Sequence, residues 1–592
     1  MTRTHSKGRT PLEVPAEHNL TTRLWQYAER SGGQEAMRYW ADATWRPLVW
    51  RELAEQVRAL AAGLIAAGIA SGDRVVILSP TRAEWTISDL AILAAGGVTV
   101  PIYETSSPDQ CGWILADSGA KIAICATQEL AARVESVRDR APALTDVVVM
   151  DDHGLEALAD RAGDDLSKVD DRVSETTGES VASIIYTSGT TGMPKGCVLT
   201  HGNLLQISRQ AQLPLGSVLL RDDASTLLFI PLAHVFARII QFAVLDVGAV
   251  LGFARSIETL SDDLKSFRPT FLLAVPRIFE KVFNRAQAQA HGAKAKIFNA
   301  AVATAMEWSE SSNPGLVTNA KKAVFDRLVY AKLRAALGGR ITHCISGGAP
   351  LAPHLAHFFH AVGVDVLEGY GLTETSAGSA VNPPEWNKIG TVGQPLPGTE
   401  FRVAEDGELS IRGPGVFAGY YNNDEATAEV LKDGWCATGD LGTIDDDGFV
   451  TITGRKKEMI VTAGGKNVAP ATLEERLKAN RLISQVMVVG DKRPFVGALV
   501  TIDEEELSAF AKEHGLQGQV SDLVRSDAVR AEVDRAVEDA NGVVSRAESI
   551  RKTAILEREF SIDGGELTPT LKVRRMVVTE HFGDAIEELY AD

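Results

Sequence analysis

A run of hydroxyl and glycine residues that ends in a lysine is the segment best suited to chemistry. It reads Tyr186-Thr-Ser-Gly-Thr-Thr-Gly-Met-Pro-Lys195-Gly196, and the apolar residues Val181, Ile184 and Ile185 before it predict a buried strand. Glycines let a backbone fold closely around an anion, while N–H groups and hydroxyls donate to phosphate oxygens. Lys195 adds a positive charge. The segment therefore predicts a loop that holds a polyphosphate.

This loop differs from the common nucleotide loop, in which the lysine directly follows a glycine at the start of a helix. Here Met193 and Pro194 separate Gly192 from Lys195, and residues 197–200 look extended. A loop rich in glycine and threonine is by itself more often a turn. The order of all eleven residues is more specific, which favours the phosphate loop and disfavours a P-loop phosphotransferase.

Five further segments place polar side chains beside glycine or proline. Alone, each has an ordinary interpretation as a turn, a solvated linker or an exposed lysine near the C-terminus. A nucleotide site nevertheless needs such groups, because Mg²⁺ takes oxygen ligands and an ionised carboxylate only accepts hydrogen bonds. The segments are Ser346-Gly347-Gly348-Ala349-Pro350, Glu368-Gly369-Tyr370-Gly371-Leu372-Thr373-Glu374-Thr375, Ala437-Thr438-Gly439-Asp440, Gly454-Arg455-Lys456-Lys457-Glu458 and Gly564-Gly565-Glu566-Leu567-Thr568-Pro569-Thr570-Leu571-Lys572.

In this order the segments resemble the AMP-forming adenylate superfamily of acyl-CoA synthetases, luciferases and peptide-synthetase adenylation domains. The resemblance covers nearly the whole chain, from about Thr22 to Lys572. It implies that the protein binds ATP with Mg²⁺ as cofactor. The implied ATP and AMP contacts are Thr187, Ser188, Gly189, Thr190, Thr191, Gly192, Lys195, Gly348, Ala349, Pro350, Glu368, Gly369, Tyr370, Gly371, Thr373, Asp440 and Arg455.

The resemblance also implies individual roles. Tyr370 would stack on the adenine, Asp440 and Arg455 would contact the ribose, and Glu374 would position the metal ion. Lys572 would bridge the incoming carboxylate and the α-phosphate, so that the acid becomes an acyl-adenylate. The residues implied to be catalytic are Lys572, Lys195, Thr373 and Glu374.

A second half-reaction with coenzyme A is implied as well. In the family, the C-terminal domain turns about a hinge that corresponds here to Lys457, and it brings Gly464, Gly465 and Lys466 to a pantetheine tunnel. His234 and Arg238 match a motif beside the acyl pocket. We expect His234 to line or gate that pocket, without acid–base chemistry.

Two features resemble long-chain fatty acyl-CoA synthetases in particular. These are the Thr568-Pro-Thr-Leu-Lys572 ending and the segment from Ala274 to Val282 with the long helical stretch after it. One alternative is a fatty acyl-AMP ligase that loads a carrier protein, although residues 454–470 lack the insertion typical of those relatives. Another is a catalytically silent nucleotide-binding homologue, which would have no reason to keep all of the implied catalytic residues.

Composition and charge limit the partners. The 592 residues carry a net charge of −18, which argues against nucleic acid and requires local neutralisation of phosphate charge. The five cysteines are scattered, which favours a reducing cytoplasm. We see no signal peptide and no membrane-spanning run. A basic amphipathic face at residues 325–337 is interpreted mainly as core packing, with peripheral contact at the inner face of a membrane as the minority interpretation. Monomer and homodimer stay open.

The patterning predicts an α/β fold in which residues 1–453 form a large domain of stacked αβ subdomains with a small antiparallel β subdomain. Residues 454–458 would form the hinge, and residues 459–592 a mobile α+β domain that carries Lys572. Residues 51–69 predict a helix and residues 74–79 a strand. We expect residues 151–179 to be a surface connection. One helical face is predicted from Phe325, Leu328, Val329, Leu333 and Leu337.

Overall fold

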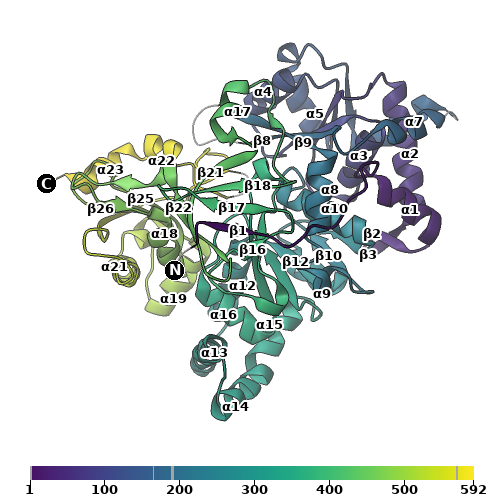
Figure 1. The fold of residues 1–592 in the computed structure, drawn as a ribbon. Coiled ribbons are helices and arrows are strands. Elements are labelled where there is room, and N and C mark those ends of the chain that lie inside the picture. The colour runs from purple at the N-terminus through teal and green to yellow at the C-terminus, as the bar shows by residue number, and fades with distance from the viewer. Residues whose placement is uncertain (1–2, 164–165, 188–192, 569–570, 592) are drawn as a thin grey trace.

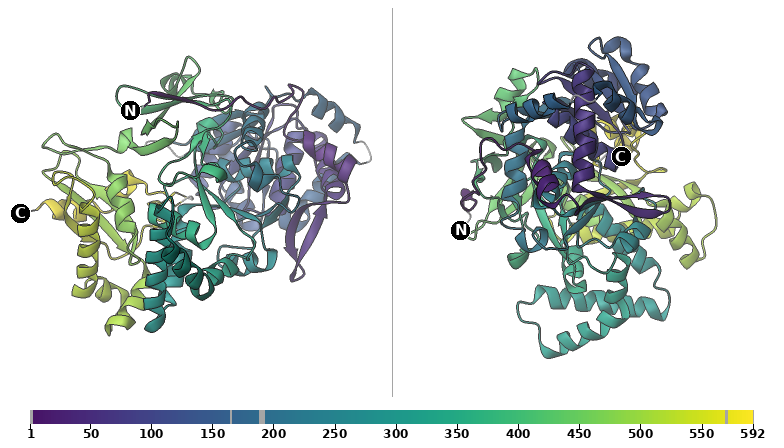
Figure 2. Two further views of the ribbon diagram at one scale, coloured as in Figure 1. Left: turned by 60° about the horizontal axis from the view of Figure 1, so that its bottom comes forward. Right: turned by 90° about the vertical axis from the view of Figure 1, so that its right-hand side faces the viewer.

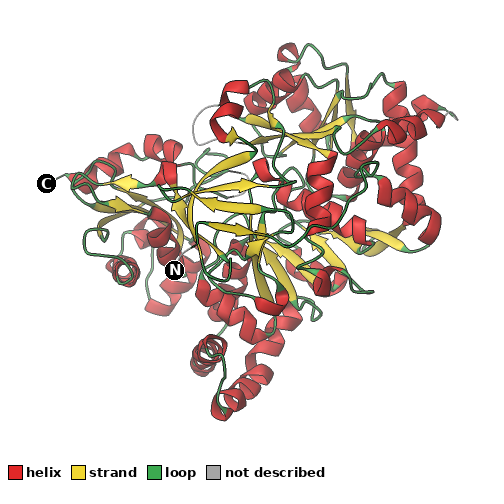
Figure 3. Ribbon diagram, in the orientation of Figure 1, coloured by secondary structure: helices red, strands yellow, loops and turns green. Residues whose placement is uncertain are grey.

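The structure is a computed structural model that describes residues 3–163, 166–187, 193–568 and 571–591. A large N-terminal domain is followed by a smaller C-terminal domain, which lies on the left of Figure 1. Figure 3 shows sheets accompanied by helices in both domains. The predicted class, a large α/β domain with an antiparallel β subdomain and an α+β domain after it, is confirmed.

A seven-stranded sheet carries the predicted phosphate loop. Its order is β19-β9-β8-β5-β4-β6-β7, with a parallel core from β8 to β7 and two antiparallel strands added at one side. The core strands are short and largely buried, as is typical of parallel sheets packed against helices. The bounds are β4 (Arg74–Leu78), β5 (Val98–Ile102), β6 (Ile122–Cys125), β7 (Asp146–Val149), β8 (Val181–Thr187), β9 (Lys195–Thr200) and β19 (Gly419–Tyr420), with helices α1 (Thr22–Ser31), α2 (Trp50–Ala66), α3 (Ala83–Ala94), α4 (Pro108–Ser118), α5 (Gln128–Glu135) and α8 (His201–Gln210).

Two further sheets complete the main part of the N-terminal domain, in the orders β12-β13-β14-β15-β16 and β10-β11-β2-β3. Strands β12, β13 and β14 are parallel, so the segments that leave β13 and β14 meet at one edge. The bounds are β2 (Glu35–Ala41), β3 (Thr44–Val49), β10 (Ser225–Leu228), β11 (Val250–Phe253), β12 (Phe271–Ala274), β13 (His343–Ser346), β14 (Asp365–Tyr370), β15 (Ala380–Val381) and β16 (Gln394–Pro395), with helices α9 (Gly216–Leu219), α10 (Val235–Val247), α11 (Leu260–Phe267) and α16 (Pro353–Val362).

The predicted antiparallel subdomain is a six-stranded sheet, and it ends in the segment that leads to the C-terminal domain. Strand β1 near the N-terminus pairs with β17, which the sequence did not predict. Strands β21 and β22 pair so that Asp440 faces Arg455. The bounds are β1 (His5–Lys7), β17 (Glu400–Val403), β18 (Glu408–Arg412), β20 (Leu431–Lys432), β21 (Trp435–Ile444) and β22 (Val450–Arg455), with helix α17 (Asp424–Val430).

The C-terminal domain has its own core around a three-stranded sheet, β25-β26-β27. Leu473, Leu477 and Val500 are completely buried in that core. Lys572 follows the sheet and precedes the last two helices. The bounds are β23 (Ile460–Val461), β24 (Asn467–Val468), β25 (Ile483–Val489), β26 (Val496–Ile502), β27 (Ile550–Ile555), α18 (Pro470–Lys478), α19 (Glu504–His514), α20 (Val520–Val524), α21 (Asp527–Asn541), α22 (Arg575–His581) and α23 (Gly583–Tyr590).

Two expectations from the sequence need correction. The expected surface connection at 151–179 contains α6 (Gly154–Ala159) and α7 (Ser167–Glu175), which pack on α2. Leu158 and Val169 are fully buried there, because one apolar residue per short helix is enough to anchor an otherwise acidic segment. The predicted helical face is also interrupted: Leu333 and Leu337 are buried, but Leu328 is 46% exposed.

The interruption has a physical cause in the helical stretch after β12. This stretch contains α12 (Pro276–Ala288), α13 (Ala293–Glu310), α14 (Leu316–Phe325), a π-helical turn (Asp326–Tyr330) and α15 (Ala331–Ala336). A π-helical turn inserts one extra residue and rotates the face that follows it. The buried side chain of Tyr330 donates from its hydroxyl to the carbonyl of Ala301 at 2.7 Å and holds α13 against the turn.

Candidate active site

The two arms of the predicted phosphate loop are neighbouring strands. Thr187 ends β8, Lys195 begins β9, and the two residues pair directly. The predicted contacts Ser188, Gly189, Thr190, Thr191 and Gly192 lie outside the described residues. Beyond them, the Trp113 indole N–H donates to the Pro194 carbonyl at 3.0 Å and holds Pro194, just before β9, against α4.

Lys195 and Glu374 meet at a tyrosine that the sequence did not predict. The Lys195 Nζ lies 5.3 Å from the centre of the Tyr420 ring, and the Tyr420 hydroxyl donates to Glu374 Oε1 at 2.7 Å. Tyr420 reaches both because β19 pairs with β9. Burial, with the Glu374 carboxylate, holds the pKa of Tyr420 well above its usual value, so the phenol stays a donor. Tyr420 therefore orients the predicted metal ligand.

Tight backbone packing carries Thr373 and Glu374 to this position. They form a 3₁₀ turn (Thr373–Thr375) directly after β14 and Gly371. A Cβ atom at Gly371 would lie 2.1 Å from the Ala377 carbonyl oxygen, and at Gly369 it would lie 3.1 Å from that of Ala380. Side chains at these glycines would push the turn away, which explains their predicted importance.

The predicted adenine wall follows β13. Gly348 takes a left-handed conformation with φ +83°, and Ala349 and Pro350 complete the turn before α16. The Glu368 carboxylate accepts from the Leu351 N–H at 3.1 Å, and burial raises the pKa of Glu368 to about 7. The Ser346 hydroxyl is buried without a hydrogen-bond partner among the described residues, which makes it available to a ligand.

Asp440 links the remaining predicted nucleotide residues. Its Oδ1 accepts from Arg455 Nε at 2.7 Å and its Oδ2 accepts from the Tyr370 hydroxyl at 2.5 Å. The Asp440 side chain is only 5% exposed. Burial acts to lower the pKa of Arg455, but Asp440 outweighs burial and the pKa is raised. These contacts hold the Tyr370 ring and the Arg455 guanidinium on either side of one carboxylate.

Lys572 enters the same group from the C-terminal domain. The Thr568 N–H donates to the Lys572 carbonyl at 2.8 Å, and the Lys572 N–H donates to Thr568 Oγ1 at 3.0 Å. Leu571 before it has a left-handed backbone, φ +61°. Lys572 is exposed as a residue, but protein atoms surround its ammonium group; this desolvation lowers the pKa of Lys572, and Arg455 lowers it further. The carboxylates that oppose this shift are Asp440, Glu458 and Glu374.

His234 lies close enough to feel the Lys572 charge. Burial first, and then Lys572, lowers the pKa of His234 to about 3, so the imidazole is neutral at pH 7. Its Nδ1 accepts from the Phe236 N–H at 3.1 Å and caps α10. A histidine that is neutral and fixed in this way suits the lining role expected from the sequence.

Arg238 has a different place from the one that the sequence suggested. It is completely buried in the N-terminal domain and pairs with Asp89, with Arg238 Nη2 2.6 Å from Asp89 Oδ1. It also donates to Ser183 Oγ at 2.6 Å. Because these bonds engage the guanidinium inside the core, Arg238 cannot contact an acyl chain or CoA, and we correct its role to positioning α10 against β8.

The residues predicted to act with CoA stand apart from this group. Gly464, Gly465 and Lys466 form the turn between β23 and β24, and Lys466 Nζ lies 3.4 Å from Glu548 in the same domain. Lys457 lies in a 3₁₀ turn (Lys456–Glu458) that connects β22 to β23. In this structure Lys572 therefore lies near the N-terminal site residues, whereas Lys466 in the 464–466 turn pairs with Glu548 of its own domain.

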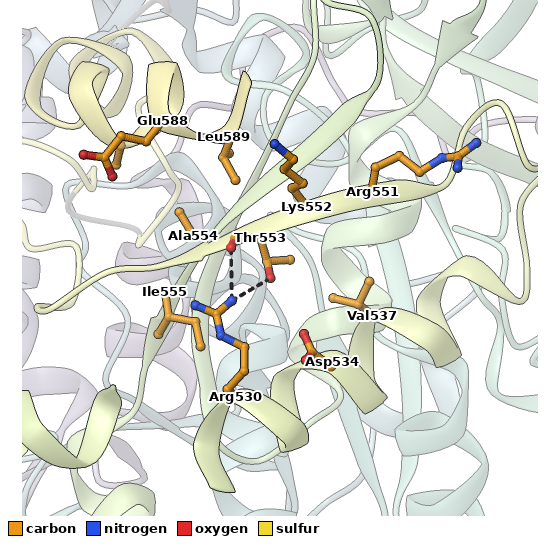
Figure 4. A pocket seen from close by; sticks show the side chains of 11 residues that line it. Arg530, Asp534, Val537, Arg551, Lys552, Thr553, Ala554, Ile555, Glu588 and Leu589 are labelled. Atoms are coloured by element: carbon orange, nitrogen blue, oxygen red, sulfur yellow. Dashed lines mark hydrogen bonds between the residues drawn. The ribbon is translucent and has the colours of Figure 1, made fainter. Parts of the chain in front are cut away.

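A cavity of about 550 Å³ opens on the C-terminal domain, away from these residues. It lies beside β27, between α21 and α23, and none of the predicted site residues lines it. In Figure 4 its three cations, Arg530, Arg551 and Lys552, point in different directions. Arg530 is engaged with the carbonyl and hydroxyl of Thr553. The cavity has no converging groups that would make it the active site.

The described residues contain no cluster of three or more potential metal ligands. All five cysteines are buried, and burial raises the thiol pKa of Cys111 to about 11 and of Cys125 to about 12. These thiols are inert structural residues. Among the described helices, none has the length and apolar character needed to cross a bilayer.

Comparison with known proteins places this site in a family. A family model described as AMP-binding enzyme matches residues 24–421, and its C-terminal domain model matches residues 457–592. The chain belongs to the AMP-binding enzyme family. It is 48% identical to the long-chain-fatty-acid–CoA ligase FadD15 of Mycobacterium bovis and 47% identical to that of Mycobacterium tuberculosis, each over 98% of both chains.

Solved structures show the same fold. The adenylation domain of a carboxylic acid reductase from Segniliparus rugosus, in complex with AMP and a co-purified carboxylic acid, superposes with a TM-score of 0.74. It is 22% identical and covers 97% of this chain and 94% of its own. At this identity the likeness supports the fold alone.

Proposed function

We propose that the protein activates a long-chain fatty acid with ATP, giving acyl-AMP and pyrophosphate, and then transfers the acyl group to CoA. The proposal is carried by the pair Asp440–Arg455 and by the approach of Lys572 from the C-terminal domain, close enough for Arg455, Asp440 and Glu374 to act on its charge. The similarity to long-chain-fatty-acid–CoA ligases over 98% of the chain supports the substrate class.

The first half-reaction is mainly an electrostatic problem. A carboxylate must attack the α-phosphorus of a polyanion, so a cation between the two lowers the barrier. The Lys572 ammonium would bridge the two reactants, while Lys195 and the loop before it would hold the departing pyrophosphate. Asp440 would accept from the ribose hydroxyls, and Tyr370 would stack on the adenine. Positioning supplies the remaining rate enhancement.

Mg²⁺ fits the site as a shared ligand of protein and nucleotide. Glu374 provides one carboxylate, fixed by Tyr420, and Mg²⁺ usually takes one or two carboxylates together with phosphate oxygens. When bound, the ion neutralises charge that develops on the pyrophosphate; Glu374 would hold it there.

The second half-reaction requires Lys572 to leave. The acyl-adenylate is a reactive anhydride that must be kept from water until the thiol arrives. We propose that the C-terminal domain turns about Lys457, withdraws Lys572 and presents Gly464, Gly465 and Lys466 to the CoA channel. CoA then attacks the acyl carbon and releases AMP, without a covalent enzyme intermediate.

The proposal predicts pyrophosphate release that depends on palmitate or oleate, and formation of the thioester when CoA is added. A chain-length series from about C6 to C20 should peak among long chains, since each buried CH₂ adds ~0.8 kcal/mol of binding. Acyl-AMP without thioester would instead indicate loading of a carrier protein. Absence of any acid-dependent pyrophosphate release would indicate a silent nucleotide-binding homologue.

An ion pair between the domains should stabilise the conformation that forms the adenylate. Arg277 at the start of α12 lies 3.4 Å from Asp503 Oδ2, while Asp503 Oδ1 accepts from the N–H groups of Glu505 and Glu506 and caps α19. Asp503→Asn keeps the cap and removes the charge. We expect it to slow acid-dependent pyrophosphate release about two- to fivefold, as for a partly exposed pair, and to spare thioester formation from supplied acyl-AMP.

A matched control removes an ion pair that lies within one domain. Glu513→Gln breaks an ion pair inside the C-terminal domain, in which Arg481 Nη2 lies 2.5 Å from Glu513 Oε2. This variant should change neither half-reaction. If Asp503→Asn slowed both half-reactions equally, the pair would be a stabilising contact of the fold and the proposed alternation would lose this support.

A further inference from the structure

A helical arm formed by residues 293–336 projects from the N-terminal domain. It appears at the bottom of Figure 1 and of the right-hand view in Figure 2. Phe298, Ala301 and Ala305 on the inner side of α13 are buried, and the hydroxyl of Tyr330 binds the carbonyl of Ala301. The arm is therefore packed on one side, and α14 forms its outer side.

The outer side of α14 and of the π-helical turn after it exposes apolar side chains that the described residues leave uncovered. Leu316 is 90% exposed, Val317 69%, Val324 56% and Leu328 46%. Val317, Val324 and Leu328 follow one another at spacings of seven and four residues, which places them on one face, and Leu316 borders that face at the start of α14. A soluble surface rarely gathers large apolar groups in this way unless they meet a partner.

The charge around this face is opposite to that of the protein as a whole. Residues 293–336 contain seven lysines and arginines against three acidic residues, whereas the chain has a net charge of −18. Lys321, Arg327 and Lys332 are exposed beside the apolar face, and Lys321 Nζ also lies 3.9 Å from Glu307 Oε2. One of the three acids, Asp326, is already paired with Arg334 at 2.7 Å. The arm thus combines a free apolar face with a basic border.

We infer that α14 docks on the surface of an anionic lipid bilayer. A helix with an apolar face and flanking lysines and arginines lies in the headgroup region, and each nearby cation gains from the negative surface potential. A symmetric contact between two copies through α14 would bring Lys321, Arg327 and Lys332 of both copies together, which is unfavourable. The inference adds a partner to the proposed function, because a bilayer is where a long-chain fatty acid dissolves.

Vesicle flotation without ATP or fatty acid tests the docking separately from catalysis. The full-length protein should bind phosphatidylcholine vesicles that contain phosphatidylglycerol more tightly than vesicles of phosphatidylcholine alone, and high salt should weaken the binding. Leu316→Ser with Val317→Ser should reduce binding roughly tenfold, since two apolar side chains no longer enter the interface. Lys321→Gln with Arg327→Gln should reduce the preference for anionic vesicles.

Leu220→Ser is the control, because Leu220 is 58% exposed and lies outside the arm. It should bind vesicles as the unchanged protein does, and all variants should release pyrophosphate normally with a fatty acid dispersed in detergent. Equal vesicle binding by the arm variants and Leu220→Ser would overturn the inference. So would a change from dimer to monomer in the arm variants without loss of vesicle binding, which would make α14 a contact between copies.

Discussion

Replacing Lys572 by alanine is expected to lower the rate of acyl-adenylate formation by at least about a hundredfold, a loss of ~2.7 kcal/mol of transition-state stabilisation. The cation is the group that we propose meets the reacting anions, and the carboxylates Asp440, Glu458 and Glu374 lie close enough to favour its charged form. Thioester formation from supplied acyl-AMP should change less than about threefold. Burst measurements of pyrophosphate and of acyl-CoA separate the two steps.

The pH dependence provides a second measurement of the same residue. The pKa of Lys572 is lowered by burial and by Arg455, so the ammonium loses its proton at a lower pH than an ordinary lysine. Adenylation should therefore decline on the alkaline side as the pH rises through that lowered pKa. Lys572→Arg keeps its charge at all accessible pH values and should abolish this decline. An identical alkaline decline in the arginine variant would assign it to another group.

The fate of Lys572→Ala in the second step distinguishes two explanations. Loss of a positioned charge affects only the step in which that charge contacts the reactants. Damage to the C-terminal domain would impair both steps and lower the melting temperature. Equal loss of adenylation and thioester formation would contradict the proposal that Lys572 withdraws between the two half-reactions.

The sequence predicted which residues gather at this site through motifs that resemble one family, and the structure joins Tyr370, Asp440 and Arg455 by hydrogen bonds. Gly371 has to be glycine, because a Cβ atom there would lie 2.1 Å from the Ala377 carbonyl oxygen. Asp440 and Arg455 are separated by 15 positions in the sequence, and the antiparallel pairing of β21 with β22 places them opposite each other. The parallel strands and the antiparallel subdomain could be predicted because buried strands leave a pattern of apolar residues in the sequence.

The contacts that the sequence could not predict depend on long-range packing. Tyr420 orients Glu374 only because a two-residue strand joins the edge of the seven-stranded sheet, and no local pattern marks that event. Arg238 was predicted as a site residue because it lies in a motif that matches one beside the acyl pocket. The structure instead pairs it inside the core with Asp89, 149 residues earlier in the chain. The left-handed backbone of Leu571 before Lys572 could not be predicted either, because leucine rarely adopts that conformation.

Asp440→Asn should raise the KM for ATP about ten- to a hundredfold with a smaller effect on the KM for the fatty acid. An ionised carboxylate offers about four acceptor positions, and Arg455 and the Tyr370 hydroxyl occupy two of them. The remaining two match the two hydroxyls of a ribose. Asparagine keeps the size but loses the charge-assisted hydrogen bonds, each worth about 1.5–3 kcal/mol.

Tyr370→Phe separates the ribose contact from the adenine contact in the same group. The phenyl ring can still stack on a base, while one hydrogen bond to Asp440 is lost, so the KM for ATP should rise only about fivefold. Glu400→Gln is the control: its side chain is 13% exposed in the same antiparallel sheet and pairs with Arg412 instead of a site residue. That variant should leave the KM for ATP unchanged. If Tyr370→Phe were as damaging as Asp440→Asn, the carboxylate would serve to hold the tyrosine, and the ribose would have to be bound by other residues.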